Sequence, residues 1–369
     1  MINNIKMVSI VLPNLRMGGA QKTFVRIANI LNAKGHKVEL VVLGQRTNLL
    51  DELDQNINYI YFNKNKTSNA FFSLSNYLRK KKPYAVLTCL NYLNILTTIS
   101  ASIFSPFSKI LISERGVFST ELKELYKGNI FRICLIKILA FLTYRKANHI
   151  IAVSNGVADD LSRSLKLNRN KIKVIYNPSA SKKVLFLSEK KIKFTHKHIF
   201  NKPTVVSVGR LEYEKGYDLL IKAFSKVIKE IDSSLLIIGE GSLREELSML
   251  IRENNLEKSV FLPGIIDNPY PYIKKSSVYV LSSRTEGLPN VLIEAMAIGT
   301  PLIAIDCNYG PREIIGNSKW GYLINNENKL AKTILKVIKD KNYIDPKGGA
   351  KDFSEETIYE QYKSLIFDN

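Results

Sequence analysis

The sequence predicts an α/β protein made of two doubly wound domains that face a central cleft. Its 369 residues are 45% hydrophobic and 24% charged, which is typical of globular chains and sufficient for two cores. Short apolar runs of strand length alternate with amphipathic stretches of helix length, and this alternation favours parallel sheets covered by helices. It breaks once, in the lysine-rich residues 179–203. In such folds a ligand binds beside the carboxyl ends of the strands.

The apolar runs define the expected elements. The predicted strands of the first half are MVSIVL (7–12), KVELVVL (37–43), AVLTCL (85–90), KILIS (109–113) and HIIAVS (149–154). Those of the second half are TVVSVGR (204–210), SLLIIG (234–239), VFLPG (260–264), VYVLSS (278–283) and PLIAI (301–305). The helical period is found in TFVRIANILNAKG (23–35), DLLIKAFSKVIKE (218–230), REELSMLIREN (244–254) and PNVLIEAMAIG (289–299).

The break in the alternation sets the expected domain boundaries. We assign residues 1–178 to an N-terminal domain and residues 179–350 to a C-terminal domain, with 179–203 as the linker and entry to the second. Residues 351–369 are expected to form a helix that returns to the N-terminal domain. The uncharged run 85–104 contains Asn91, Asn94 and several hydroxyl residues, so a strand followed by a helix explains it better than a membrane span.

The net charge of +21 is unevenly distributed. Residues 1–170 carry 24 Lys and Arg against 9 Asp and Glu, whereas residues 171–369 carry 30 against 24. The first half would therefore be attracted to a polyanion, either nucleic acid or an anionic bilayer surface. No helix-turn-helix, zinc-finger or RNP-like segment supports the nucleic-acid alternative.

Cysteine and histidine usage argues against metal sites and disulfides. The three cysteines, Cys89, Cys134 and Cys307, are far apart and odd in number, which fits a reducing compartment. No secretory signal is visible, so a cytoplasmic location is expected. The segment GEGSL (239–243) lacks the third glycine of a dinucleotide fingerprint, and no cofactor is expected.

Two glutamates eight residues apart mark SSRTEGLPNVLIEAMAIG (282–299) as a candidate site. Glu286 lies in a Gly/Pro turn, and Glu294 lies within an otherwise apolar helix, where burial is costly without a bonding partner. The helix start would bind a phosphate through its free N–H groups. Glu294, just beyond it, would accept ribose hydroxyls. In the alternative, Glu286 is a helix cap and Glu294 is bonded elsewhere in the protein.

Two further loops follow predicted strands. In VGRLEYEKG (208–216), Arg210 and Lys215 suit a diphosphate, since Arg binds it as a fork and Lys as a point charge; a solvated loop is the alternative. In LPNLRMGGAQKTF (12–24), Gly18 and Gly19 would bring backbone amides to an anion, or they form a tight turn.

Together these motifs resemble the retaining, metal-independent glycosyltransferases of the GT-B fold, in the family 4 (group 1) type that builds bacterial surface polysaccharides. That fold consists of two Rossmann-like domains, an N-terminal acceptor-binding one and a C-terminal one for the nucleotide-sugar donor. The resemblance covers nearly the whole chain. Its motifs, in family order, are MGGAQ, IIAVSNGVADDL, VIYNP, VGRLEYEKG, LLIIGEG, FLPG, SSRTEGLPNVLIEAMAIGTPLIA and GPREII.

The resemblance implies roles for the matching residues. Arg210 and Lys215 would bind the donor diphosphate and stabilise the leaving nucleotide, so these two and Glu286 are the expected catalytic residues. Glu286 would bind the donor sugar and Glu294 the ribose. The remaining donor-binding positions would be Gly18 and Gly19 at the diphosphate, Gly264 near the base, and Gly287, Leu288 and Asn290 close to phosphate or sugar.

The resemblance also bears on metals and on the acceptor. No Asp-x-Asp motif is present, and DELD (51–54) has the wrong spacing, so Arg210, Lys215 and the helix dipole would replace a metal. Some relatives carry a histidine near the reacting carbon. Here ISERGVFST (112–120) offers Glu114 and Arg115 instead, as acceptor-binding or catalytic residues or as an ordinary salt-bridged loop.

The implied reaction moves a hexose or N-acetylhexosamine from a nucleotide sugar to a glycan or polyprenyl-diphosphate-linked acceptor, in capsule, O-antigen or lipopolysaccharide synthesis. UDP is the preferred nucleotide, with GDP and ADP as alternatives. RKKK (79–82) and residues 130–146 could rest on an anionic inner leaflet, or 130–146 is a core helix with solvated charges. A sugar-nucleotide epimerase and a nucleic-acid-binding protein are the rival functions.

Overall fold

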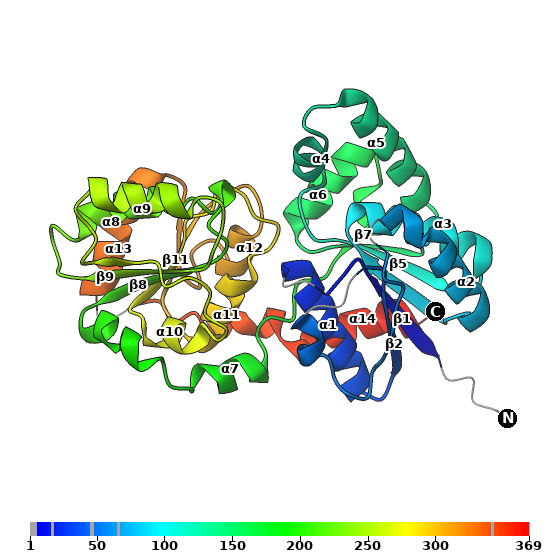
Figure 1. Ribbon diagram of the computed structural model, residues 1–369, viewed down its shortest axis with the longest axis horizontal. Helices are drawn as coiled ribbons and strands as arrows, with labels where there is room; N and C mark the ends of the chain where they lie inside the picture. Colours follow the sequence, from blue (N-terminus) through cyan, green and yellow to red (C-terminus); the bar gives the residue numbers. More distant parts are fainter. Residues whose placement is uncertain (1–5, 16–17, 45–47, 65–66, 341–342, 369) are drawn as a thin grey trace. The chain divides into compact units, whose positions relative to one another are not determined.

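The protein is described by a computed structural model that covers residues 6–15, 18–44, 48–64, 67–340 and 343–368. The chain divides into two compact units. Unit 1 comprises Met1–Pro178 and Glu355–Asn369, and unit 2 comprises Ser179–Ser354. Each unit is a parallel sheet with helices packed on its two faces (Figure 1), which is the fold class that the alternating pattern predicted.

Unit 1 is built on a sheet with the strand order β3-β2-β1-β4-β5-β6-β7, and every pairing between its described strands is parallel. The strands are β1 (Met7–Leu12), β2 (Lys37–Val42), β3 (Asn58–Tyr61), β4 (Ala85–Cys89), β5 (Lys109–Glu114), β6 (His149–Ala152) and β7 (Ile172–Val174). The helices are α1 (Gly19–Ala33), α2 (Phe71–Lys81), α3 (Asn91–Phe104), α4 (Phe118–Tyr126), α5 (Ile130–Tyr144), α6 (Asn155–Leu165) and α14 (Glu355–Phe367), with short 3-10 helices at η1 (Asn48–Glu52), η2 (Thr67–Ala70) and η3 (Arg169–Lys171).

Unit 2 repeats this plan with the strand order β10-β9-β8-β11-β12-β13, again parallel throughout the described strands. The strands are β8 (Thr204–Val208), β9 (Ser234–Ile238), β10 (Val260–Phe261), β11 (Val278–Leu281), β12 (Leu302–Ile305) and β13 (Tyr322–Ile324). The helices are α7 (Lys182–Ser188), α8 (Tyr217–Val227), α9 (Arg244–Glu253), α10 (Tyr270–Lys275), α11 (Asn290–Ile298), α12 (Pro311–Ile315) and α13 (Leu330–Lys339), with 3-10 helices η4 (Phe194–Asn201), η5 (Tyr213–Lys215), η6 (Glu327–Lys329) and η7 (Lys347–Phe353).

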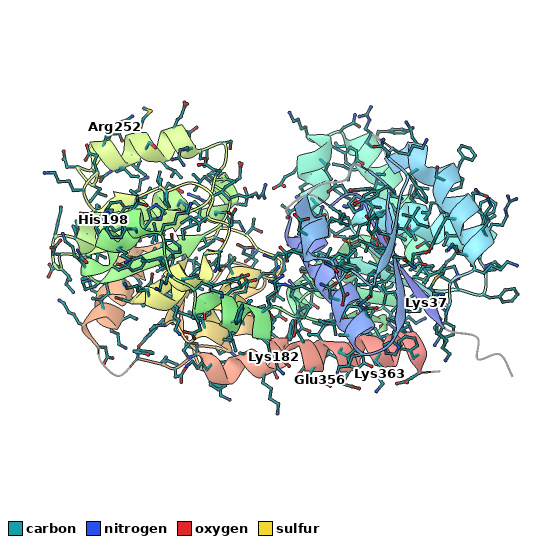
Figure 2. All side chains as sticks on the ribbon, turned by 60° about the horizontal axis from the view of Figure 1, so that its bottom comes forward. Lys37, Lys182, His198, Arg252, Glu356 and Lys363 are labelled. Atoms are coloured by element: carbon teal, nitrogen blue, oxygen red, sulfur yellow. The ribbon has the colours of Figure 1, made fainter. Side chains whose placement is uncertain are left out.

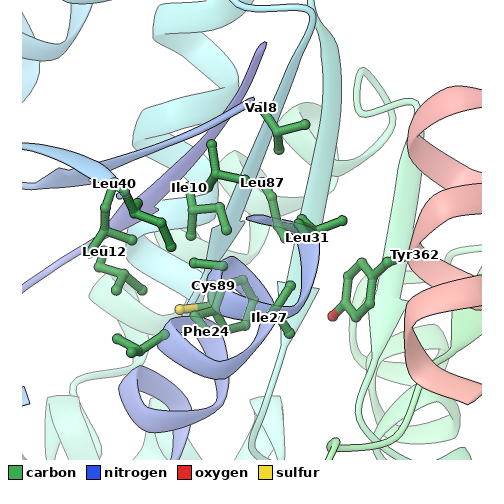
Figure 3. Packing of buried hydrophobic residues seen from close by; sticks show 14 of the residues in the cluster. Val8, Ile10, Leu12, Phe24, Ile27, Leu31, Leu40, Leu87, Cys89 and Tyr362 are labelled. Carbon is green, nitrogen blue, oxygen red and sulfur yellow. The ribbon is translucent and has the colours of Figure 1, made fainter. Parts of the chain in front are cut away.

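The core of unit 1 includes residues from the far end of the chain. Helix α14 packs Ile358, Tyr362 and Ile366 into the cluster formed by α1 and the central strands, and Figure 3 shows Tyr362 facing Ile27 and Leu31 of α1. The amphipathic period explains this, because three buried side chains at i, i+4 and i+8 share one helix face. The opposite side of α14 carries Glu356 and Lys363 (Figure 2).

The predicted strands are all present, and the predicted helices agree to within a turn. The run 85–104 is strand β4 followed by helix α3, as expected. Some elements were not predicted from the sequence. The stretch 179–203, expected as the linker and entry to the second domain, contains α7 and η4, two elements that were not predicted, and lies in unit 2. Strands β3, β7 and β13 were not predicted, and each lies at the edge of its sheet.

The packing of α14 can be tested because the single tryptophan, Trp320, lies in unit 2 and its fluorescence reports on that unit. Ile358→Ala should lower the free energy of unfolding of unit 1 by about 2–5 kcal/mol, the usual cost of such a cavity. Urea unfolding followed by circular dichroism should shift, while the Trp320 transition stays in place. Ile103→Ala, at an exposed position of α3, is the control. A wild-type circular-dichroism curve for Ile358→Ala would contradict the packing.

Candidate functional site

The loop after β8 and the loop after β11 meet at the carboxyl ends of two paired strands. Gly216 makes this approach possible, because a Cβ there would lie 2.2 Å from the carbonyl oxygen of Ser282. Its φ of 62° is also in the left-handed region that favours glycine. Ser282 Oγ donates to the carbonyl oxygen of Lys215 at 2.9 Å. The loops that carry VGRLEYEKG and SSRTEGLPN therefore pack directly against each other through their backbones.

Lys215 and Glu286 form an ion pair at this junction. Lys215 Nζ lies 2.7 Å from Glu286 Oε1, and Ser283 Oγ donates to the same oxygen at 2.7 Å. The side chains are only 22% and 10% exposed, respectively, so the pair is less screened than a surface salt bridge. Two residues predicted from separate motifs thus lie in direct contact.

Arg210 is placed differently from the other predicted cation. It follows β8 directly, its side chain is 72% exposed, and its guanidinium lies 2.8 Å from Glu214 Oε1. Among the residues that the structure describes, its ion-pair partner is Glu214 rather than Glu286. The structure therefore leaves Arg210 in solvent at the same edge of the sheet.

Helix α11 starts at Asn290, next to this pair. Pro289 is the N-cap residue, with φ −73° and ψ 101°. The helix therefore begins one residue later than the predicted start at Pro289. Gly287 and Leu288 form the turn, and they pack against Gly310, where a Cβ would lie 3.0 Å from the carbonyl oxygen of Gly287. Asn290 Oδ1 accepts a hydrogen bond from Ser179 Oγ at 3.2 Å. This turn brings the free N–H groups of the helix start to the same edge as Lys215.

Glu294 is buried, at 5% exposed. Tyr270 Oη, from the start of α10, donates to Glu294 Oε1 at 3.2 Å. A hydrogen bond within unit 2 therefore satisfies one oxygen of this carboxylate, as the structural alternative in the sequence analysis required. The partner tyrosine was not identified from the sequence, since nothing in its local pattern distinguishes it from a core residue.

Gly264 lies in the loop after β10, at the same edge of the sheet. Its φ is 83°, its carbonyl oxygen accepts from the N–H of Gly239 at 3.0 Å, and a Cβ would lie 2.9 Å from Glu240 Oε1. Glu240 is in turn held by Arg244 at 2.6 Å. The glycine thus allows the loops after β9 and β10 to lie close together.

Arg284 forms a brace that links the loop after β11 to the loop after β8 and the start of α8. Its sequence context did not predict this role. Its guanidinium donates two hydrogen bonds to Asp218, at 2.8 and 2.7 Å, and another to the carbonyl oxygen of Tyr213 at 2.9 Å. It also stacks over the Tyr213 ring at 4.2 Å, while its own N–H bonds to the carbonyl oxygen of Glu214 at 2.8 Å. Bidentate geometry makes this a strong, directional contact, which fixes Lys215 and Glu286 relative to one another.

In unit 1, the two predicted glycines lie at the start of α1. Gly18 is the N-cap residue and its carbonyl oxygen accepts the N–H of Lys22 at 3.0 Å, while Gly19 is the first helical residue and is exposed. A Cβ at Gly18 would lie 2.5 Å from Gln21 Oε1. Met17, the first residue of the MGGAQ motif, lies outside the described residues.

Glu114 is the last residue of β5, and Arg115 follows it directly. Glu114 is buried and accepts hydrogen bonds from Tyr144 Oη and from Asn94 Nδ2, the latter at 2.8 Å. Arg115 donates to Asn177 Oδ1 and to Ser113 Oγ. The printed partners of these two side chains are therefore neutral polar groups on other residues, and no ion pair between the two is found among the described contacts.

The protonation of Glu114 follows from its surroundings. Burial, followed by the like charge of Glu121, raises the pKa of Glu114 to about 8. Burial also raises the pKa of Glu121 to about 7, with Glu124 and Asp160 adding to the effect. Glu114 is therefore a neutral acid near pH 7, able to hold or donate a proton. Sequence reasoning missed Glu121 and Asp160, which belong to other elements.

The described ranges contain neither a metal-binding cluster nor a membrane-spanning helix. Within residues 6–15, 18–44, 48–64, 67–340 and 343–368, no group of His, Cys, Asp and Glu side chains could hold a metal ion. In the same part of the chain, each helix is too short or too polar to cross a bilayer.

Comparison with known proteins identifies the family. A family model described as glycosyl transferases group 1 matches residues 188–355, and one described as glycosyltransferase family 4 matches residues 17–179. An uncharacterised glycosyltransferase of Methanocaldococcus jannaschii is 31% identical over 280 residues, which span 66% of this chain and 69% of that protein. The chain belongs to the group 1, family 4 glycosyltransferases.

Two further matches extend the comparison. An N-acetylgalactosaminyltransferase of Campylobacter jejuni that acts on a diphospho-undecaprenol-linked glycan is 32% identical over 252 residues, 68% of this chain and 65% of that enzyme. The crystal structure of Anabaena HepE with UDP and glucose has a TM-score of 0.80 at 17% identity, covering 98% of this chain and 99% of that one. The glycosyltransferase therefore has the GT-B fold. Family membership favours transfer over the epimerase and nucleic-acid-binding alternatives.

The Arg284 brace of this glycosyltransferase gives a pH-dependent prediction. The hydrogen bonds from Arg284 hold the pKa of Asp218 below its ordinary value. Their contribution to stability is therefore full above the unfolded-state pKa of about 3.9 and is lost as pH falls through the lower folded-state pKa. Asp218→Asn should cost unit 2 about 1.5–3 kcal/mol near neutral pH, and much less at about pH 3.

Thermal unfolding followed by Trp320 fluorescence measures this difference across the pH range. Asp352→Asn, which makes the same substitution at an exposed position of unit 2, is the control. A gap between Asp218→Asn and wild type that stays constant with pH would show that the carboxylate charge contributes nothing to the brace.

Proposed function

We propose that this glycosyltransferase is a retaining, metal-independent enzyme that moves a hexose or N-acetylhexosamine from a nucleotide sugar to a glycan or lipid-linked acceptor. The observation that carries the proposal is the Lys215–Glu286 pair, with its 2.7 Å contact, beside the start of α11. A cation, a carboxylate and free helix N–H groups at one sheet edge suit a ligand with a diphosphate and a sugar.

The donor diphosphate would bind where these groups converge. Negative charge builds on it as the bond to the sugar breaks, and fixed positive charge and the helix dipole favour that change. Lys215 is neutralised by Glu286 in the ligand-free protein. An arriving diphosphate would compete for Lys215 and release Glu286 to accept hydroxyls of the donor sugar. Arg210, exposed beside them, has the freedom to turn onto the diphosphate from Glu214.

The nucleotide would lie along the same edge of unit 2. Glu294 is proposed to bind the ribose through its carboxylate, and Gly264 is proposed to lie near the base. HepE was crystallised with UDP, which supports UDP as the nucleotide. The C. jejuni relative transfers N-acetylgalactosamine to a diphospho-undecaprenol-linked glycan, which supports an amino sugar and a lipid-linked acceptor. We propose that the product belongs to capsule, O-antigen or lipopolysaccharide.

The acceptor would approach unit 1. Gly18 and Gly19 at the start of α1 offer backbone N–H groups to the donor diphosphate from this unit. Glu114, a neutral acid near pH 7 because of its raised pKa, and Arg115 are proposed to contact the acceptor or the reacting sugar. The hydrogen bonds from Tyr144 and Asn94 hold the Glu114 carboxyl in place.

The donor site is tested by titration calorimetry of UDP, GDP, ADP and CMP, without added metal. One diphosphate should bind, and Glu294→Gln should weaken it by about 1–3 kcal/mol, the cost of losing a charged hydrogen bond. Tyr270→Phe is the matched control, because it removes the internal bond to Glu294 and leaves the carboxylate in place. Equal affinity in wild type and Glu294→Gln, or equal losses in both variants, would show that Glu294 is structural.

A membrane-facing surface in unit 1 supports the lipid-linked acceptor. Helix α5 exposes Phe131, Leu135, Ile138 and Leu142, which share one helix face because they are spaced i, i+4, i+7 and i+11. No acidic residue is present in α5. An apolar face of this kind, on the basic half of the chain, fits the surface of an anionic bilayer. We therefore propose peripheral binding at the cytoplasmic face of the inner membrane.

Vesicle co-sedimentation tests this surface. Replacing Phe131, Leu135 and Ile138 together by Gln should reduce binding to phosphatidylglycerol vesicles at least about tenfold, since each buried apolar side chain contributes roughly 1.5–3 kcal/mol. The control variant carries three Gln substitutions at exposed apolar positions of unit 2, namely Leu185, Phe194 and Met249. Both should bind UDP like the wild type. Equal vesicle binding by the two variants would assign the face to something other than lipid.

A further inference from the structure

Unit 1 contains a concave site whose lining includes Tyr144, the residue that bonds to Glu114. It is a cavity of about 530 Å³ bounded by the end of α5, the turn before β6 and the segment that joins α6 to β7. Strands β6 and β7 begin here, so the cavity lies at the amino-terminal edge of the parallel sheet. Glu114 lies at the other edge, where β5 ends. The cavity is large enough for a small ligand and is separate from the proposed catalytic residues.

The charges that line this cavity have one sign. Its walls carry five basic residues and no Asp or Glu; the basic residues are Arg145, His149, Lys166, Lys171 and Lys173. Among the described residues, none of these side chains forms an ion pair. Arg169 is a contrast, because it lies in the same segment, outside the cavity wall, and bonds to Asp159 at 2.5 Å. Grouped cations repel each other, and an anion would relieve that repulsion.

His149 lies in the cavity wall beside these cations. Burial lowers its pKa, and the positive charges of Lys109 and Lys173 lower it further. Burial and the surrounding cations therefore both disfavour protonation of the imidazole. A negatively charged ligand in the cavity would act in the opposite direction.

Neutral hydrogen-bond donors complete the lining. Asn148 Oδ1 accepts the backbone N–H of Ile110 at 2.7 Å, and Asn168 Oδ1 accepts that of Asn170 at 3.0 Å. These bonds hold the two amide side chains in place, and within the described residues their NH2 groups make no hydrogen bond. Amide NH2 groups among lysines and an arginine match an oxyanion with several acceptor oxygens.

We propose that this cavity binds a phosphate or diphosphate group. The apolar stripe of α5 ends at Leu142, three residues before Arg145, so a lipid head group could reach the cavity while its acyl chains follow α5. A free phosphate compound would use the same donors. The proposal does not depend on the donor site of unit 2, and its test separates the two sources.

The test replaces Lys166, Lys171 and Lys173 together by Gln. The control replaces Lys229, Lys258 and Lys332, three exposed lysines of unit 2 that form no described ion pair, and so removes the same charge. Each protein is saturated with UDP and then titrated with inorganic diphosphate, with hydrogen–deuterium exchange read over residues 144–149 and 165–173. Each is also sedimented with vesicles made anionic by phosphatidylglycerol, and with vesicles made anionic by a fatty acid.

The cavity variant should lose at least about tenfold in affinity relative to the control, with diphosphate-dependent protection of both segments in the wild type only. If the cavity variant loses affinity for both diphosphate and phosphatidylglycerol vesicles, the cavity recognises phosphate in either source. If it loses affinity for diphosphate alone, the ligand is a soluble phosphate compound. If it loses affinity for phosphatidylglycerol vesicles but not for fatty-acid vesicles, the ligand is a lipid head group. Equal behaviour of the two variants with every probe, or equal losses on both kinds of vesicle without loss for diphosphate, would overturn the proposal. UDP affinity, measured first, tests the donor site separately.

Discussion

The candidate site depends on how closely the loop after β8 approaches the loop after β11. At Gly216 a side chain would collide with the backbone of Ser282, and that contact brings Lys215 to Glu286. Arg284 then ties the same two loops together through Asp218 and Tyr213. The Lys215–Glu286 pair is therefore positioned by the packing of the two loops that follow neighbouring parallel strands. A ligand that separates the two side chains need not move the backbone of either loop.

The central strands could be predicted from the sequence because they are buried on both faces and form continuous apolar runs. Strands β3, β7 and β13 were missed for the opposite reason. Each is an edge strand, three or four residues long and partly exposed, so its local pattern resembles a loop. Its conformation is set by pairing with a neighbour, which depends on tertiary structure. The lysine-rich segment before β8 likewise gave no clean period, although it contains α7 and η4.

The site residues divide in the same way. Lys215 and Glu286 were proposed from motifs and are in contact, while their roles remain predictions. Asp218 and Arg284 are 66 residues apart, and only the fold brings them together. The sequence raised the question of what a carboxylate within an apolar helix bonds to, but it could not answer it. Tyr270 is one such partner, and it comes from a helix whose position no local pattern reveals.

The path of the chain through unit 1 has a consequence for biosynthesis. Residues of α14 complete the hydrophobic core around α1, yet they follow the whole of unit 2 in the sequence. A ribosome delivers the chain from its amino end, and domains usually fold in that order. Here the first unit to emerge is the last to be finished, because its core stays open on one side until α14 leaves the exit tunnel. During that interval the surface of α1 that α14 later covers is available to chaperones.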